Sequence, residues 1–99
     1  MLEINKKIIF LSAGGHIKPA IGILLEHTKS AVSSQHFLQI INCFELVDKL
    51  YRKGNEAEQE LIIHRFSDVL VQLHHTVRKA AWCAMKRYIP APLYIHFNS

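Results

Sequence analysis

The sequence lacks the features that would place it in a membrane or in a disordered class. No apolar run approaches the roughly 20 residues that a membrane-spanning helix needs. The first 15 residues hold too short an apolar stretch for a secretory signal, and Glu3 lies where such a signal is basic. With 49% hydrophobic and 20% charged residues, the chain has a globular composition. We therefore expect a cytoplasmic protein with a single helical domain over residues 1–99.

Cysteine is scarce, and its spacing excludes the common zinc and redox motifs. Cys43 and Cys83 are the only two cysteines, and neither belongs to a CxxC pair. In a cytoplasmic protein we expect both to be free thiols, with Cys43 on the apolar side of its helix. No catalytic triad and no set of metal ligands can be assigned from the residue order. We expect no metal, no cofactor and no enzymatic activity.

Acidic residues are absent from the last third of the chain. Residues 1–68 are formally neutral, and the net charge of +4 comes from four cations that follow Asp68. Cations stabilise the last turns of a helix, where the helix dipole is negative, and this is one explanation of their position. The other explanation is a basic patch that binds an acidic protein or nucleic acid. The four cations are Arg78, Lys79, Lys86 and Arg87.

Two long segments have the period of amphipathic helices. Residues 33–53 carry apolar side chains three and four positions apart, and Ser33 or Ser34 is suited to be the N-cap. A longer helix is predicted over residues 56–87, ended by the prolines that follow it. Its apolar stripe comprises Ile62, Phe66, Val69, Leu70, Leu73, Val77, Ala80, Ala81 and Ala84.

The junction between these helices has both a stop and a start signal. Gly54 is suited to the left-handed residue that ends a helix. Asn55, followed by Glu58 three positions later, has the pattern of a capping box. The sequence therefore predicts a tight helical corner here.

The remaining segments complete a small bundle. Pro19 favours the first turn of a helix over residues 19–29, and Gly14 and Gly15 separate it from residues 2–12, which fit either a helix or a strand. Residues 91–99 form an apolar tail that we expect to pack against the helices. The predicted fold is all-α, a small antiparallel helical bundle of about four helices with an apolar C-terminal tail.

The loop at residues 14–19 resembles the first phosphate loop of glycosyltransferases that act on lipid-linked peptidoglycan precursors. The matching residues are Gly14, Gly15, His16 and Pro19. That fold requires alternating strands and helices, whereas the two segments after the loop have a helical period. We therefore interpret the two glycines as a break between helices.

Residues 37–70 resemble small bacterial helical proteins of the immunity type. In that group a helix ends in an aromatic residue and a Gly-Asn or Gly-Asp turn, and an acidic residue begins the next helix. The resemblance implies a protein that neutralises a toxin by binding it, without catalysis. The matching positions are Tyr51, Gly54, Asn55, Glu56, Ile63, Phe66 and Leu70, with Pro90 after the long helix.

One side of the predicted long helix combines apolar and basic residues opposite the apolar stripe. A fully solvated face has no need of a tryptophan, so either the chain termini cover this side or a partner binds it. The residues of this predicted strip are His64, Val71, His75 and Trp82, flanked by Lys79 and Lys86.

We therefore predict a non-catalytic protein that binds another protein, such as an immunity protein, an adaptor or a secretion chaperone. The partner is expected to be acidic if the lysines take part, and a second copy of the chain is an alternative. A nucleic-acid-associated regulator that uses Arg78, Lys79, Lys86 and Arg87 is the second hypothesis.

Overall fold

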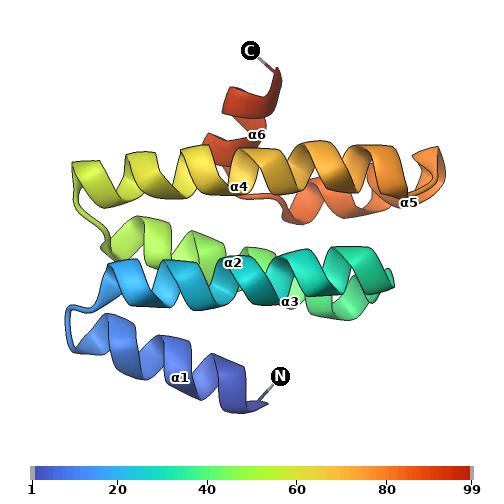
Figure 1. The fold of residues 1–99 in the computed structure, drawn as a ribbon. Coiled ribbons are helices and arrows are strands. Elements are labelled where there is room, and N and C mark those ends of the chain that lie inside the picture. The colour runs from blue at the N-terminus through green and yellow to red at the C-terminus, as the bar shows by residue number, and fades with distance from the viewer. Residues whose placement is uncertain (1, 99) are drawn as a thin grey trace.

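The computed structural model describes residues 2–98, and it describes side chains except those of residues 2–5, 12 and 98. This part of the chain forms six α-helices and one short 3₁₀ helix, and it contains no strand (Figure 1). The elements are α1 (Leu2–Ala13), α2 (Ile17–Ser34), α3 (Phe37–Lys53), α4 (Glu56–Thr76), α5 (Lys79–Met85), η1 (Lys86–Tyr88) and α6 (Ala91–Asn98).

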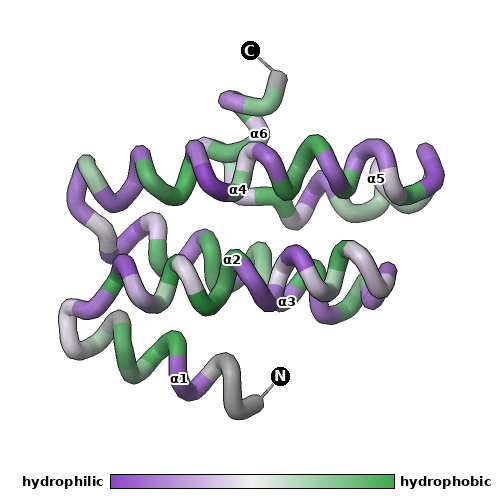
Figure 2. The backbone as a smooth tube through the Cα atoms, in the orientation of Figure 1, coloured by the Kyte–Doolittle hydropathy of each residue, from purple (hydrophilic) through white to green (hydrophobic). Residues whose placement is uncertain are grey.

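The all-α prediction is confirmed, and α2 is the central helix of the bundle. It packs against α1, α3 and α4, while α6 crosses α4 on the side away from α2 (Figure 1). Apolar and polar residues alternate in short blocks along α3 and α4 (Figure 2), as helices with one buried face require. The largest fully buried side chains include Leu24, Ile40, Phe44, Leu50, Ile62, Phe66 and Leu70.

The corner between α1 and α2 ends one helix and begins another. Gly15 has a positive φ of 83°, and the His16 N–H donates to the Leu11 carbonyl over 2.7 Å. This is the left-handed helix ending in which glycine is favoured. Residues 2–12, for which the sequence left helix and strand open, are helical, and the predicted helix break at the Gly-Gly pair is confirmed.

The corner between α2 and α3 differs from the prediction. Ser33 and Ser34 lie in the last turn of α2, and α3 begins only at Phe37 with no side-chain cap. The turn closes on Gln35, which has a left-handed φ of 56°, while the His36 N–H donates to the Ala31 carbonyl. The sequence does not reveal this turn because glycine, the residue typical of it, is replaced by glutamine.

The corner between α3 and α4 is where the sequence placed it. The Glu58 N–H donates to the Asn55 side chain, and the Asn55 N–H donates to the Glu58 carboxylate, each over 2.9 Å. The predicted capping box is therefore confirmed. Gly54, however, is extended (φ −77°, ψ 152°) rather than left-handed. Its lack of a side chain serves close packing, because a Cβ there would lie 3.1 Å from the Cβ of Glu58.

The prediction of one long helix over residues 56–87 is wrong beyond Thr76, where α4 ends. Val77 and Arg78 are extended, the chain turns back, and α5 runs beside the end of α4 (Figure 1). Neither residue is a glycine or a proline, so the sequence gives no strong sign of this break. The turn buries Val77 and the later Trp82, while Ala80 and Ala84, assigned to the apolar stripe, are exposed.

The C-terminal segment is a helix rather than an irregular tail. Pro92 lies in the first turn of α6, where proline is tolerated because no hydrogen bond is lost there. Leu93 is fully buried and Phe97 packs against the core, so the predicted packing of this segment onto the bundle is confirmed. The count of about four helices is too low, because the break after α4 and the ordered C-terminus add α5 and α6. Among the described residues, no helix combines the length and hydrophobicity that crossing a bilayer requires.

Candidate functional site

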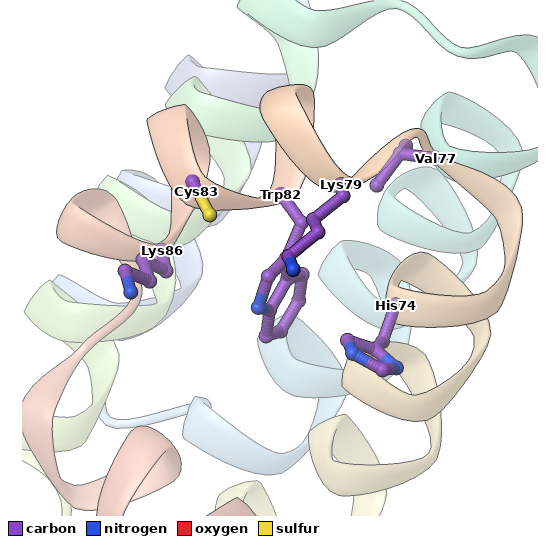
Figure 3. A pocket seen from close by; sticks show the side chains of 6 residues that line it. All are labelled: His74, Val77, Lys79, Trp82, Cys83 and Lys86. Atoms are coloured by element: carbon purple, nitrogen blue, oxygen red, sulfur yellow. The ribbon is translucent and has the colours of Figure 1, made fainter.

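An open cleft of about 490 Å³ lies where the end of α4 meets α5 (Figure 3). The side chain of His74 comes from the last turn of α4, and that of Val77 from the turn that follows it. The other lining residues belong to α5 and to the first position of η1. They are Lys79, Trp82, Cys83 and Lys86.

Trp82 forms the inner wall of this cleft. Its ring centroid lies 4.8 Å from that of His74, in an edge-to-face arrangement, and 5.4 Å from that of Phe97 in α6. Only 9% of the Trp82 surface remains exposed. Because α4, α5 and α6 all contribute to this aromatic contact, Trp82 holds the two C-terminal helices against the bundle.

The contact between His74 and Trp82 depends on the turn after Thr76. Eight residues of a continuous helix would separate the two side chains by about 12 Å. In the structure the chain reverses at Val77 and Arg78, so the two rings meet. The cleft is therefore a product of tertiary structure, and the amphipathic pattern of residues 56–87 does not predict it.

The charge of the cleft is positive and uncompensated within the described side chains. Lys79 and Lys86 are exposed, no acidic residue lines the cleft, and neither lysine forms an ion pair. The last acidic residue of the sequence is Asp68, in the middle of α4. Two ion pairs of the described residues lie elsewhere, between Lys29 and Glu26 and between Arg52 and Asp48.

The helix dipole does not explain two of the four C-terminal cations. Arg78 is the N-cap of α5 and Lys79 is its first residue. Both therefore lie at the positive end of a helix dipole, and not at the negative end of the predicted long helix. The first turn of α5 contains no acidic residue, and no side chain caps it. Lys86 and Arg87 lie after α5, near its negative end, where the dipole favours them.

The structure divides the strip predicted on one side of the long helix. Lys79, Trp82 and Lys86 line the cleft, but His64, Val71 and His75 remain outside its lining. The strip is divided because α4 ends at Thr76 and α5 runs in a different direction. The His64 ring lies beside that of His96 in α6, at 6.0 Å between centroids, and Val71 and His75 are exposed on α4.

The four cations of the nucleic-acid hypothesis point to different sides of α5. Arg78 lines a second groove of about 610 Å³, together with Phe37 at the start of α3. Lys79 and Lys86 line the cleft. The Arg87 guanidinium carbon lies 6.0 Å from the centroid of the neighbouring Tyr88 ring.

Three lining residues of the cleft were not among the predicted site residues. Cys83 and Lys86 follow Lys79 at the i, i+4 and i+7 spacing of one helix face, so the sequence contained a signal for Cys83. His74 and Val77 had no such signal, because their place in the cleft depends on the chain reversal. In the described part of the chain, no cluster of three or more His, Cys, Asp or Glu residues could hold a metal ion.

Comparison with known proteins gives a family but no described activity. No curated protein and no solved structure matches the chain. One family, described as "Domain of unknown function (DUF7674)", matches residues 3–99, almost the whole sequence. Because this match covers almost the whole sequence, the chain belongs to the DUF7674 family.

Proposed function

We propose that this chain is a non-catalytic binding protein whose partner is an acidic protein, and that the cleft between α4 and α5 is part of the contact surface. The observation that carries the proposal is a cleft with an aromatic wall and two uncompensated lysines. Tryptophan in an apolar wall is typical of interface contacts. Lysines that form no ion pair within the protein are free to pair with carboxylates of another molecule, which favours the binding of an acidic partner.

The position of the cations gives further support. Arg78 and Lys79 oppose the dipole of α5, so their presence there is locally unfavourable. Residues that are unfavourable for their local structure, in a sequence that otherwise suits its fold, are expected at functional sites. A bound acidic partner would convert the conflict into an attractive interaction.

The resemblance of residues 37–70 to immunity-type proteins is consistent with a binding role. Those residues comprise α3 and most of α4, which form a helical hairpin, and the residues that line the cleft follow this segment in the chain. Among the binding roles, we propose neutralisation of a toxin first, with adaptor and secretion chaperone as the other forms of the same activity. The hairpin supplies the scaffold, and the cleft supplies the contact.

The test is affinity capture from the native host with the immobilised protein. The double variant Lys79→Glu/Lys86→Glu reverses the charge of the cleft, and Lys49→Glu/Lys53→Glu makes an equal change in net charge on the exposed side of α3. We expect an acidic protein that the wild type and the α3 variant retain and the cleft variant does not. Titration of the purified partner should show a loss of affinity of at least tenfold for the cleft variant alone.

The second hypothesis, binding to nucleic acid, gives a different outcome in the same assay. Phosphate neutralisation makes affinity fall steeply with salt, and in this hypothesis the contacts come from the C-terminal cations, so Lys79→Glu/Lys86→Glu would weaken a binding that high salt also abolishes. A partner that disappears after nuclease treatment would contradict our proposal and favour the regulator. An acidic partner retained equally by the wild type and both variants would show that the cleft is not the contact surface.

A further inference from the structure

Four residues of α5 and η1 lie on one side of the helix and face the cleft. Lys79, Trp82, Cys83 and Lys86 have the spacing i, i+3, i+4 and i+7, which places side chains on one helix face over two turns. The order along this face is a cation, an aromatic wall with a thiol beside it, and a second cation (Figure 3). A ligand for this face has the complementary order of an anion, an apolar group and an anion.

The spacing of the lysines sets the spacing of those anions. Seven residues of helix at about 1.5 Å each separate Lys79 and Lys86 by roughly 10 Å along the axis of α5. A peptide in the polyproline II conformation rises about 3.1 Å per residue and returns to the same side every three residues. Carboxylates three positions apart in such a peptide are about 9 Å apart and point the same way, so they match the lysines.

The shape of the cleft suits an extended peptide. The cleft is open, with a volume of about 490 Å³, and His74 and Val77 form its wall opposite α5. An extended chain can lie along α5 with one apolar side chain in the cleft and its carboxylates at the spacing of the lysines.

We infer that the partner presents a short extended acidic segment, in which two Glu or Asp residues three positions apart flank an apolar residue. The carboxylates pair with Lys79 and Lys86, and the apolar side chain lies against the exposed edge of Trp82 beside Val77. This inference rests on the proposed function, because it names the part of the acidic partner that the cleft recognises.

The only tryptophan of the chain lines the cleft, so binding can be followed by intrinsic fluorescence without a label. The probe is an eight-residue peptide, Gly-Ser-Glu-Leu-Pro-Glu-Ser-Gly, in which the proline favours the extended conformation. Three control peptides replace the central four residues with Gln-Leu-Pro-Gln, Glu-Ser-Pro-Glu or Glu-Glu-Leu-Pro. The controls remove the charge, remove the apolar group, or keep the composition and change the spacing.

We expect the probe to bind at least tenfold more tightly than each control, and to protect the exposed Cys83 thiol from alkylation. Lys79→Gln/Lys86→Gln should weaken binding at least tenfold, while the matched variant Lys49→Gln/Lys53→Gln should leave it unchanged. Equal affinity for the probe and the peptide of altered spacing would overturn the inference, as would a probe that gives no saturable fluorescence change.

Comparison with the capture assay separates this inference from the proposed function. If the cleft variant loses the acidic partner but no peptide binds, the partner uses another kind of segment, and only this inference fails. If the cleft variant keeps the partner and no peptide binds, both fail. A DNA duplex that binds more tightly than the probe, with the steep salt dependence of phosphate contacts, would also overturn the inference.

Discussion

At the scale of single residues, the two cysteines differ because one is inside the bundle and the other is on its surface. Cys43 is fully buried in α3, whereas Cys83 is exposed on α5. Burial raises the pKa of the Cys43 thiol, and a hydrogen bond with the Thr28 side chain opposes this rise in part. The thiolate is the reactive form, so burial and a raised pKa both protect Cys43.

We therefore expect native protein to take up one iodoacetamide group at pH 8, at Cys83, and unfolded protein to take up two. Mass spectrometry of the intact chain and of its peptides measures this directly. The sign follows from the pKa, since a raised value leaves less thiolate at pH 8 than an ordinary thiol has. Equal labelling rates for Cys43 and Cys83 in the native protein would show that the α2–α3 contact is open.

Trp82 is the residue that links the candidate site to the stability of the fold. Truncating a buried tryptophan to alanine removes a large apolar contact and leaves a cavity, so Trp82→Ala should lower the free energy of unfolding by about 3 kcal/mol. Trp82→Phe keeps ring contacts with His74 and Phe97, so it should lower the free energy of unfolding less than Trp82→Ala does. Urea unfolding followed by circular dichroism measures both. A loss below about 1 kcal/mol for the alanine variant would contradict the buried position.

At the scale of elements, the helix corners decide where the bundle turns, and the glycines at them have different roles. Gly15 supplies a left-handed backbone at the end of α1, and Gly54 supplies space at the end of α3. Gly22, in the exposed part of α2, supplies neither, because nothing lies within 4 Å of an added Cβ there. The same substitution should therefore have opposite effects at two of these positions.

Gly54→Ala should destabilise the protein by about 1 kcal/mol, because its Cβ would lie 3.1 Å from that of Glu58 and crowd the capping box. Gly22→Ala should stabilise it by roughly 0.5–1 kcal/mol, because alanine is the better helix former and meets no neighbour. Thermal unfolding of the two variants gives the comparison. A stabilising Gly54→Ala would mean that the α3–α4 corner is looser than the structure shows.

At the scale of the whole molecule, α6 is part of the folded bundle although it is short and lies at the end of the chain. It packs across α4 (Figure 1). Leu93 is fully buried, and the Phe97 ring lies against that of Trp82. The C-terminal helix thereby covers the side of α4 that would otherwise expose the aromatic contact. The candidate cleft depends on α6 even though no residue of α6 lines it.

Leu93→Ala should therefore lower the free energy of unfolding by about 2–4 kcal/mol, the range for a fully buried leucine. Ile95→Ala, on the same helix at 68% exposure, should change it by less than about 0.5 kcal/mol and is the matched control. Urea unfolding followed by Trp82 fluorescence also reports whether the cleft and the bundle unfold together. Equal, small effects of the two variants would place α6 outside the cooperative unit.

Local signals in the sequence determined the helical class, the α1–α2 break and the α3–α4 corner. The period of Ile62, Phe66 and Leu70 fixes the buried face of α4, because a helix can bury only one side against its neighbour. Asn55 and Glu58 fix the start of that helix through hydrogen bonds between residues three apart. Such features depend on neighbours in the chain, so the order of residues is sufficient to predict them.

Tertiary structure alone decided where the long segment after Asn55 breaks and which residues line the cleft. Thr76, Val77 and Arg78 are compatible with a helix, and the chain leaves the helix there because reversal buries Val77 and Trp82 against α4 and α6. The reversal also moves Ala80 and Ala84 out of the apolar stripe and separates His64 from Trp82. A contact such as that of His74 with Trp82 joins residues on two helices, and helical periodicity holds no information about such pairs.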